Sequence, residues 1–151
     1  MNYTDLYITD LSSIQNVTPK LSTLTNSKIL ITGGGGLIGS ALIDFLLNLN
    51  DTTNAKNKVF VAARHEEKIK ERFRDRFTRY DFNFIKYNAL KPLNFDVVFD
   101  YIIHAASPAN PAAYVKQPVE TMLANIIGIN HLLDYARTHP VKRVLYISSS
   151  E

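Results

Sequence analysis

Four consecutive glycines, Gly33–Gly36, lie between two apolar segments of the chain. The preceding run, Lys28–Thr32, is short and rich in β-branched residues, which is typical of a buried strand. The following segment, Leu37–Leu49, is apolar at helical spacing. A strand that turns directly into a helix needs a residue without a side chain, because the tight turn requires a positive φ. The pattern therefore predicts a strand–turn–helix unit of a parallel sheet.

The spacing of the glycines predicts what this turn binds. Gly34-x-Gly36-x-x-Gly39 matches the dinucleotide-binding pattern, and Gly33-x-x-Gly36-x-x-Gly39 matches a three-spaced variant of it. Glycines in such a turn let a pyrophosphate approach the backbone and let the helix pack closely on the strand. The start of the helix adds unpaired N–H groups and a partial positive charge. A flexible glycine turn is the alternative, whereas a P-loop is disfavoured because no Gly-Lys-Ser/Thr follows.

Strand and helix patterns alternate along the rest of the chain. They predict strands at 59–63, 82–87, 101–106 and 143–148, helices at 66–80 and 117–138, and a polar loop at 51–57. This order predicts an α/β fold with a Rossmann-type doubly wound parallel sheet, in three layers and truncated after the fifth strand. Residues 1–27 are expected to form an N-terminal extension, with a short helix at 3–15 and a linker. Residues 28–151 are expected to form an incomplete NAD(P)-binding domain.

Composition narrows the range of functions. A chain with 46% hydrophobic and 21% charged residues is ordinary for a globular domain. Cysteine is absent, which excludes disulfides, a thiol nucleophile and Cys-ligated metal sites, and the four histidines lack metal-site spacing. A net charge of +3 gives no argument for nucleic acid. The sequence has neither a signal-peptide pattern nor a run long enough to cross a membrane, so a cytoplasmic protein without membrane or nucleic-acid partners is expected.

The end of the second predicted strand bears on the choice of cofactor. An acidic residue there suits the ribose hydroxyls of NAD, and a basic residue suits the 2′-phosphate of NADP. The sequence has no acid at this point, and Arg64 follows the strand directly. NADP is therefore favoured over NAD. The alternative is that Arg64 pairs with Glu66 or Glu67 on the surface.

The motifs together resemble one known family. The loop from Thr32 to Ser40 resembles the TGGxGxIGS loop of the extended short-chain dehydrogenase/reductase family, which includes nucleotide-sugar epimerases, dehydratases and decarboxylases. The segments that follow are similar to those of UDP-glucuronate decarboxylases and dTDP-glucose dehydratases. These segments are His104-Ala105-Ala106, Ser107–Pro111 with Tyr114 and Pro118, Asn125–Gly128, and Ser148–Glu151.

The resemblance implies a role for individual residues. Ser149 matches the catalytic Ser/Thr of the family, Asn125 matches an asparagine near its active site, and Asn88 stands where an acid often contacts the adenine amine. For Asn125 the alternative is a satisfied polar residue between helix and sheet. The residues expected to bind the cofactor are Gly33, Gly36, Leu37, Ile38, Gly39, Arg64, Asn88, Ala105, Ala106, Ser107 and Asn125.

One part of the family pattern is missing from this sequence. The resemblance implies a catalytic Tyr-x-x-x-Lys pair beyond Ser149, but the sequence ends two residues after this serine. We therefore expect the cofactor-binding half of an NAD(P)-dependent nucleotide-sugar epimerase, dehydratase or decarboxylase, inactive by itself. In the whole enzyme, hydride would pass between the sugar and the nicotinamide. The alternatives are a non-catalytic dinucleotide-binding module and an NADP-dependent nucleotide-sugar reductase.

The helix predicted at 117–138 is apolar on more than one side. Leu123, Ile127 and Leu132 lie outside a stripe that consists of Met122, Ile126, Ile129, Leu133 and Ala136. Monomeric proteins rarely expose an apolar surface of this kind. The family resemblance implies a homodimer that covers this face, and the alternative is that residues 1–17 fold back over it.

Overall fold

Five parallel strands form one sheet in the computed structural model, which describes residues 4–107 and 115–148. The order across the sheet is β3-β2-β1-β4-β5. β2 and β3 therefore lie on one side of β1, and β4 and β5 lie on its other side. The strands are β1 (Lys28–Thr32), β2 (Lys58–Ala63), β3 (Phe82–Lys86), β4 (Tyr101–His104) and β5 (Arg143–Tyr146).

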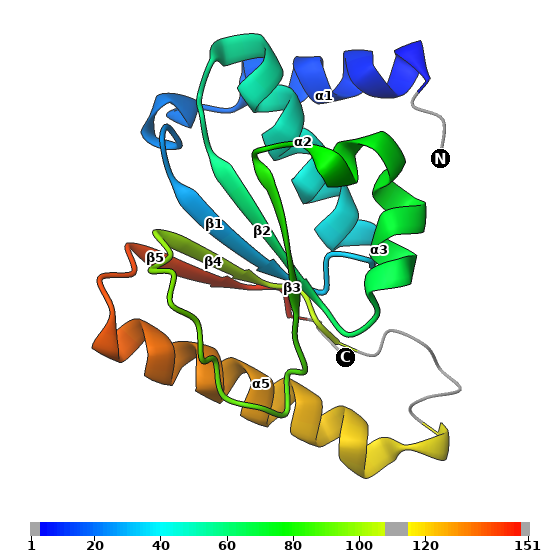
Figure 1. Ribbon diagram of the computed structural model, residues 1–151, viewed down its shortest axis with the longest axis vertical. Coiled ribbons are helices and arrows are strands. Elements are labelled where there is room, and N and C mark those ends of the chain that lie inside the picture. Colours follow the sequence, from blue (N-terminus) through cyan, green and yellow to red (C-terminus); the bar gives the residue numbers. More distant parts are fainter. Residues whose placement is uncertain (1–3, 108–114, 149–151) are drawn as a thin grey trace.

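Helices cover both faces of this sheet, which confirms the predicted three-layer α/β fold. Figure 1 shows α2 (Leu37–Thr53) and α3 (Glu66–Phe73) on one face and α5 (Pro118–Thr138) on the other. A hydrophobic core lies on each face of the sheet. The side chains of β1 alternate between these two cores, so that Ile29 and Ile31 face α2 and α3 while Leu30 faces α5. None of the described helices is long and apolar enough to cross a membrane.

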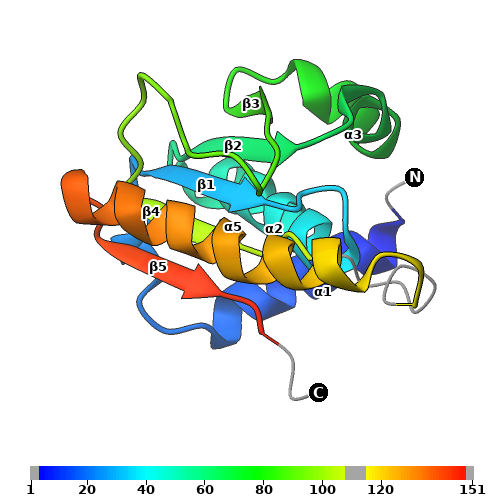
Figure 2. The same ribbon diagram turned by 90° about the horizontal axis from the view of Figure 1, so that it is seen from below.

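The first helix, α1 (Asp5–Val17), packs on the outside of α2. The Tyr7 hydroxyl donates a hydrogen bond to the Asp44 carboxylate (3.1 Å), and Leu11 is buried beneath the helix. Figure 2 confirms that α1 and α5 lie on opposite sides of the sheet. Because the two helices are separated in this way, α1 does not cover the apolar stripe of α5.

The region after β2 differs from the prediction. A single helix was expected from 66 to 80, but α3 ends at Phe73 and a 3₁₀ turn, Arg74–Thr78, follows it. The backbone at Arg74 has a φ of 44°, which interrupts the helix. The turn still places Phe77 against Phe82, at a ring separation of 5.5 Å. Tertiary packing therefore outweighs the helical periodicity here.

Other boundaries shift by a few residues. The expected loop at 51–57 begins later, because α2 continues through Thr53 and ends where Asn54 adopts a left-handed conformation with a φ of 55°. Strands β4 and β5 end at His104 and Tyr146, two residues before the predicted ends. The predicted sequence of elements is otherwise confirmed.

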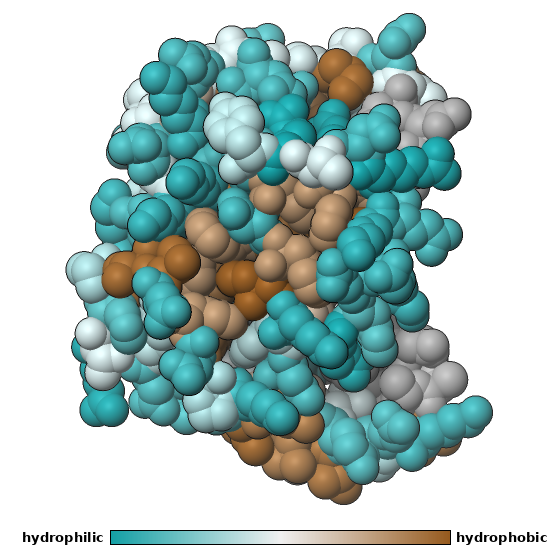
Figure 3. Space-filling view, in the orientation of Figure 1, coloured by the Kyte–Doolittle hydropathy of each residue, from teal (hydrophilic) through white to brown (hydrophobic). Residues whose placement is uncertain are grey.

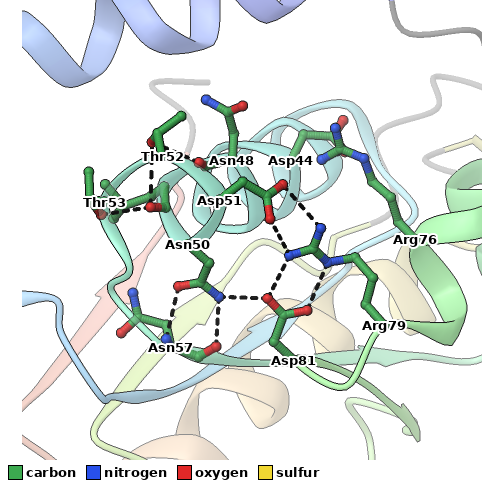
Figure 4. Close-up of polar contacts among 11 residues, drawn as sticks. Asp44, Asn48, Asn50, Asp51, Thr52, Thr53, Asn57, Arg76, Arg79 and Asp81 are labelled. Atoms are coloured by element: carbon green, nitrogen blue, oxygen red, sulfur yellow. Dashed lines mark hydrogen bonds and ion pairs between the residues drawn. The ribbon is translucent and has the colours of Figure 1, made fainter.

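A polar network holds the amino-terminal edge of the sheet (Figure 4). Asn50 donates to the Asp81 carboxylate and to the Asn57 carbonyl, at 2.8 Å each, and accepts from the Asn57 N–H. Arg79 donates to both oxygens of Asp81 and also pairs with Asp51. The end of α2 is thereby tied to the starts of β2 and β3.

Candidate cofactor-binding site

The glycine turn lies at the carboxyl end of β1, between neighbouring strands. Gly33 has a φ of 74°, and its N–H donates to the carbonyl of Ala62 on β2. A Cβ at Gly33 would lie 2.5 Å from the Ala105 carbonyl, so a side chain cannot fit there. A Cβ at Gly39 would likewise lie 2.5 Å from the Gly33 carbonyl. These two glycines allow the turn, the helix and the end of β4 to come into direct contact.

A cavity of about 350 Å³ opens beside this turn. It lies at the carboxyl ends of β1, β2, β3 and β4, and the first turns of α5 form its opposite wall. Strand order reverses at β1, and ligands of open α/β sheets bind at such a reversal. The lining includes seven of the predicted cofactor-binding residues, which are Gly33, Gly36, Arg64, Asn88, Ala105, Ala106 and Ser107.

The remaining predicted residues lie elsewhere. Leu37 and Ile38 begin α2 and are 88% and 51% exposed, and Gly39 is buried beneath the turn. Asn125 does not line the cavity but a separate shallow hollow beside Met122. Its Oδ1 atom is buried and has no hydrogen-bond partner among the described residues. Ser149 lies outside the described part of the chain, as do Asn110, Pro111 and Tyr114.

Basic side chains form one wall of the cavity. Arg64, His65 and Lys68 line it together, where β2 ends and α3 begins. The nearby acids are engaged elsewhere, because Glu66 and Glu67 pair with Lys70 at 3.0 and 3.3 Å. Arg64 therefore does not pair with Glu66 or Glu67 in the structure, so this alternative is wrong. Lys68 was missed in the sequence analysis, although a second basic residue four positions after Arg64 was a signal for it.

The carboxyl end of β3 contributes Tyr87 and Asn88 to the lining. The Oδ1 atom of Asn88 accepts a hydrogen bond from the Leu90 N–H (3.0 Å), and a carbonyl oxygen can accept a second bond. Burial raises the pKa of Tyr87 to about 12, so its hydroxyl stays neutral. This part of the wall is therefore polar but uncharged.

A buried histidine lies beneath the turn. His104 ends β4, and its Nδ1 atom is 2.6 Å from the Oγ1 atom of Thr32 at the end of β1. Burial lowers the pKa of His104, which keeps the imidazole neutral. The ring also stacks on Tyr146, with centroids 5.5 Å apart. His104 thus joins the ends of three strands directly below the residues that line the cavity.

Comparison with known proteins identifies the family. The sequence model of the NAD dependent epimerase/dehydratase family matches residues 29–151. The chain belongs to this family.

Several members of the epimerase/dehydratase family are similar to this chain. UDP-glucuronic acid decarboxylase 3 of Arabidopsis thaliana is 37% identical over 150 residues, which cover 93% of this chain and 42% of that protein. UDP-glucuronic acid decarboxylase 1 of Danio rerio is 32% identical and matches 94% of this chain and 32% of its own length. The chain thus spans less than half the length of these relatives.

Solved structures support the same fold. The UDP-glucuronic acid 4-epimerase of Bacillus cereus, in complex with UDP-glucuronic acid and NAD, superposes with a TM-score of 0.65 at 24% identity. That match covers 82% of this chain and 40% of the epimerase. Pen from Bacillus thuringiensis gives a TM-score of 0.63 at 27% identity, over 82% of this chain and 37% of Pen.

The residues at the cavity of this family member fit a dinucleotide. The glycines let β1, α2 and the end of β4 pack closely around the turn. Gly36, the N-cap residue of α2, has no side chain that would occupy the N–H groups at the start of this helix. The adjoining wall is cationic, as a phosphorylated ligand requires. Small residues, Ala105 and Ala106, leave room along the end of β4.

Proposed function

We propose that this chain binds NAD(P) in the cavity and forms the cofactor-binding part of a nucleotide-sugar epimerase, dehydratase or decarboxylase. The observation that carries the proposal is the glycine turn next to a cavity at the reversal of strand order, in which neighbouring backbone leaves no room for a Cβ at Gly33 or Gly39. The bound nicotinamide would supply a hydride acceptor. Relatives named as UDP-glucuronic acid decarboxylases support a nucleotide sugar as the substrate of the whole protein.

Each predicted residue has a place in this proposal. Gly33 and Gly36 shape the turn, and the backbone N–H groups of Leu37, Ile38 and Gly39 at the start of α2 hold the pyrophosphate. Asn88 accepts a hydrogen bond from the adenine amine. Ala105, Ala106, Ser107 and Asn125 would contact the cofactor, and Ser149 would act toward the sugar.

The proposal includes a preference for NADP over NAD. No acid stands at the end of β2, and Arg64 makes no ion pair within residues 4–107 and 115–148. A free guanidinium beside the adenosine ribose would bind a 2′-phosphate through charge-assisted hydrogen bonds. The same observation favours a second candidate function, an NADP-dependent nucleotide-sugar reductase.

A homodimer through α5 completes the proposal. Val119, Met122, Ile126 and Leu133 are each more than half exposed, and Figure 3 shows apolar side chains gathered over α5 at the lower edge of the view. Since α1 packs on α2 instead, this face is available to a second copy of the chain. A contiguous exposed apolar surface on a helix typically marks an interface with another protein chain.

Calorimetric titration with NAD and NADP tests the binding function. The wild-type chain should bind at least one of them, and Gly36→Val should abolish binding. A Cβ at this position would lie 3.3 Å from the Gly33 carbonyl, and the valine methyl groups would occupy the space that the pyrophosphate needs. The backbone at Gly36 is extended, with a φ of −80°, so valine is compatible with folding. Unchanged affinity in a folded Gly36→Val variant would refute the site.

A further inference from the structure

The imidazole of His104 is completely buried, and its two nitrogens have different environments. The Nδ1 atom lies 2.6 Å from the Oγ1 atom of Thr32, within hydrogen-bond distance. The Nε2 atom is buried and has no hydrogen-bond partner among the described residues. A neutral imidazole suits this environment, because only one of its nitrogens carries a proton.

The Nε2 atom of His104 faces α5 at Gly128. A Cβ on Gly128 would lie 3.3 Å from Nε2 and 3.1 Å from the Cβ of Ala89, so the glycine allows a close approach of the helix. Gly128 follows Ala124, which lines the cavity, by about one helical turn. The contact between His104 and Gly128 therefore determines how closely α5, the opposite wall of the cavity, approaches β4.

The residues that contact the buried ring supply no carboxylate and no cation. These residues are Thr32 of β1, Tyr146 of β5, whose ring stacks at 5.5 Å, and Gly128 of α5. Two titratable groups flank this contact on α5. The Nδ1 atom of His131 lies 3.3 Å from the Ala89 carbonyl, and Glu120 lines the cavity. An imidazolium would thus have no opposite charge in contact with it among the described residues.

A second proton on His104 would disturb this packing. The imidazolium carries an N–H on both nitrogens, and the N–H of Nε2 would have no acceptor at the contact with Gly128. A buried charge and an unpaired donor both cost free energy unless water reaches them. Burial accordingly lowers the pKa of His104. Admitting water at this contact separates α5 from β4 and widens the cavity.

Resting on the proposed function, we propose that His104 is a positioning residue that couples dinucleotide binding to the loss of a proton. The neutral ring lets α5 pack against β4 and so keeps the two walls of the cavity at the separation that the dinucleotide bridges. The protonated ring releases α5, and the site loses affinity as the pH falls. By reciprocity, a bound dinucleotide opposes protonation of the ring.

Calorimetric titrations between about pH 7.5 and pH 5 test this coupling, with whichever of NAD and NADP the wild-type chain binds more tightly. Below the lowered pKa of His104, the affinity should fall by up to about tenfold per pH unit, which is the limit for one proton. The variant His104→Asn should lose this dependence, because its amide can still bond to Thr32 but does not titrate. The 2′-phosphate of NADP titrates at about pH 6 with either protein, so the comparison cancels its contribution.

Two other histidines serve as controls. His131→Gln, also on α5, should keep the wild-type pH dependence. His65 lines the cavity, where a proton on its ring would attract the anionic ligand, so His65→Gln should make the fall in affinity steeper. An NMR titration of the wild-type chain measures the coupling without any variant. The pKa of His104 should be lower in the bound chain than in the free chain.

The outcomes separate this inference from the function beneath it. If the wild type and His104→Asn show the same pH dependence, or if the pKa of His104 is the same in the free and bound chains, the inference is wrong. A fall in affinity that only follows unfolding, measured by circular dichroism, would also overturn it. If neither dinucleotide binds at neutral pH, the proposed function itself fails.

Discussion

Arg79 at the amino-terminal edge of the sheet offers a test of what stabilises the fold apart from the cavity. Its guanidinium donates two hydrogen bonds of 2.8 Å to Asp81, which is completely buried, and two more to Asp51. Burial alone would raise the pKa of Asp81, but hydrogen bonds from Arg79 and Asn50 hold it below its ordinary value. The charge at Asp81 therefore depends on Arg79.

The expected cost of Arg79→Ala follows from these contacts. Asp81 would keep the hydrogen bond from Asn50 but lose its charged partner, and a buried carboxylate deprived of such a partner costs about 3 kcal/mol of unfolding free energy. Loss of the ion pair with Asp51 adds little to this cost in unfolding free energy, because the Asp51 side chain is 47% exposed. Asp51→Ala is thus a matched control, with an expected loss below about 1 kcal/mol.

Urea unfolding followed by circular dichroism measures this difference. With a slope of about 2 kcal/mol per molar, Arg79→Ala should lower the urea midpoint by about 1.5 M. NADP affinity of the folded variant should not change, because the network lies at the amino-terminal edge of the sheet and the cavity lies at the carboxyl ends of the strands. A loss of stability no larger than that of Asp51→Ala would show that the charge at Asp81 does not depend on Arg79.

Three further predictions concern the cavity, the apolar helix and the buried histidine. Arg64→Ala should weaken NADP by about 1–3 kcal/mol and barely change NAD in calorimetry; a wild-type chain that prefers NAD would contradict it. Ile126→Glu should convert a dimer to a monomer in light scattering, whereas a wild-type monomer at high concentration would exclude the α5 interface. Because burial lowers the pKa of His104, the unfolded state binds more protons below pH 6.5, so stability should fall as pH falls from there. His104→Gln should remove this part of the pH dependence in urea titrations, and an unchanged slope would contradict it.

The order of strands and helices could be predicted because it depends on local periodicity. The continuous apolar run of β2 is typical of a buried parallel strand, and β2 is buried beside β1. The glycine turn was predictable for the same reason, since its need for a positive φ at Gly33 is local. The fold and the place of the candidate site thus followed from the sequence.

Features that depend on distant contacts could not be predicted in this way. The end of α3 at Phe73 accompanies a tertiary contact, in which Arg72 and Arg76 both reach Asp44. Asp44, an acid within the apolar part of α2, was a signal for such a contact, but the sequence does not show which partners it has. Lys68 was missed because only Arg64, which follows β2 directly, was considered as a basic residue beside the cofactor.

Binding of a dinucleotide in the cavity beside the glycine turn can be followed through the backbone amide resonances of the ¹⁵N-labelled chain as NADP is added. We expect shifts that saturate at Gly33–Ile38, Arg64, Lys68 and Ala105, with none at Asn50, Asn57 or Asp81. Saturable shifts confined to the second group, or no shifts with a folded chain, would contradict it.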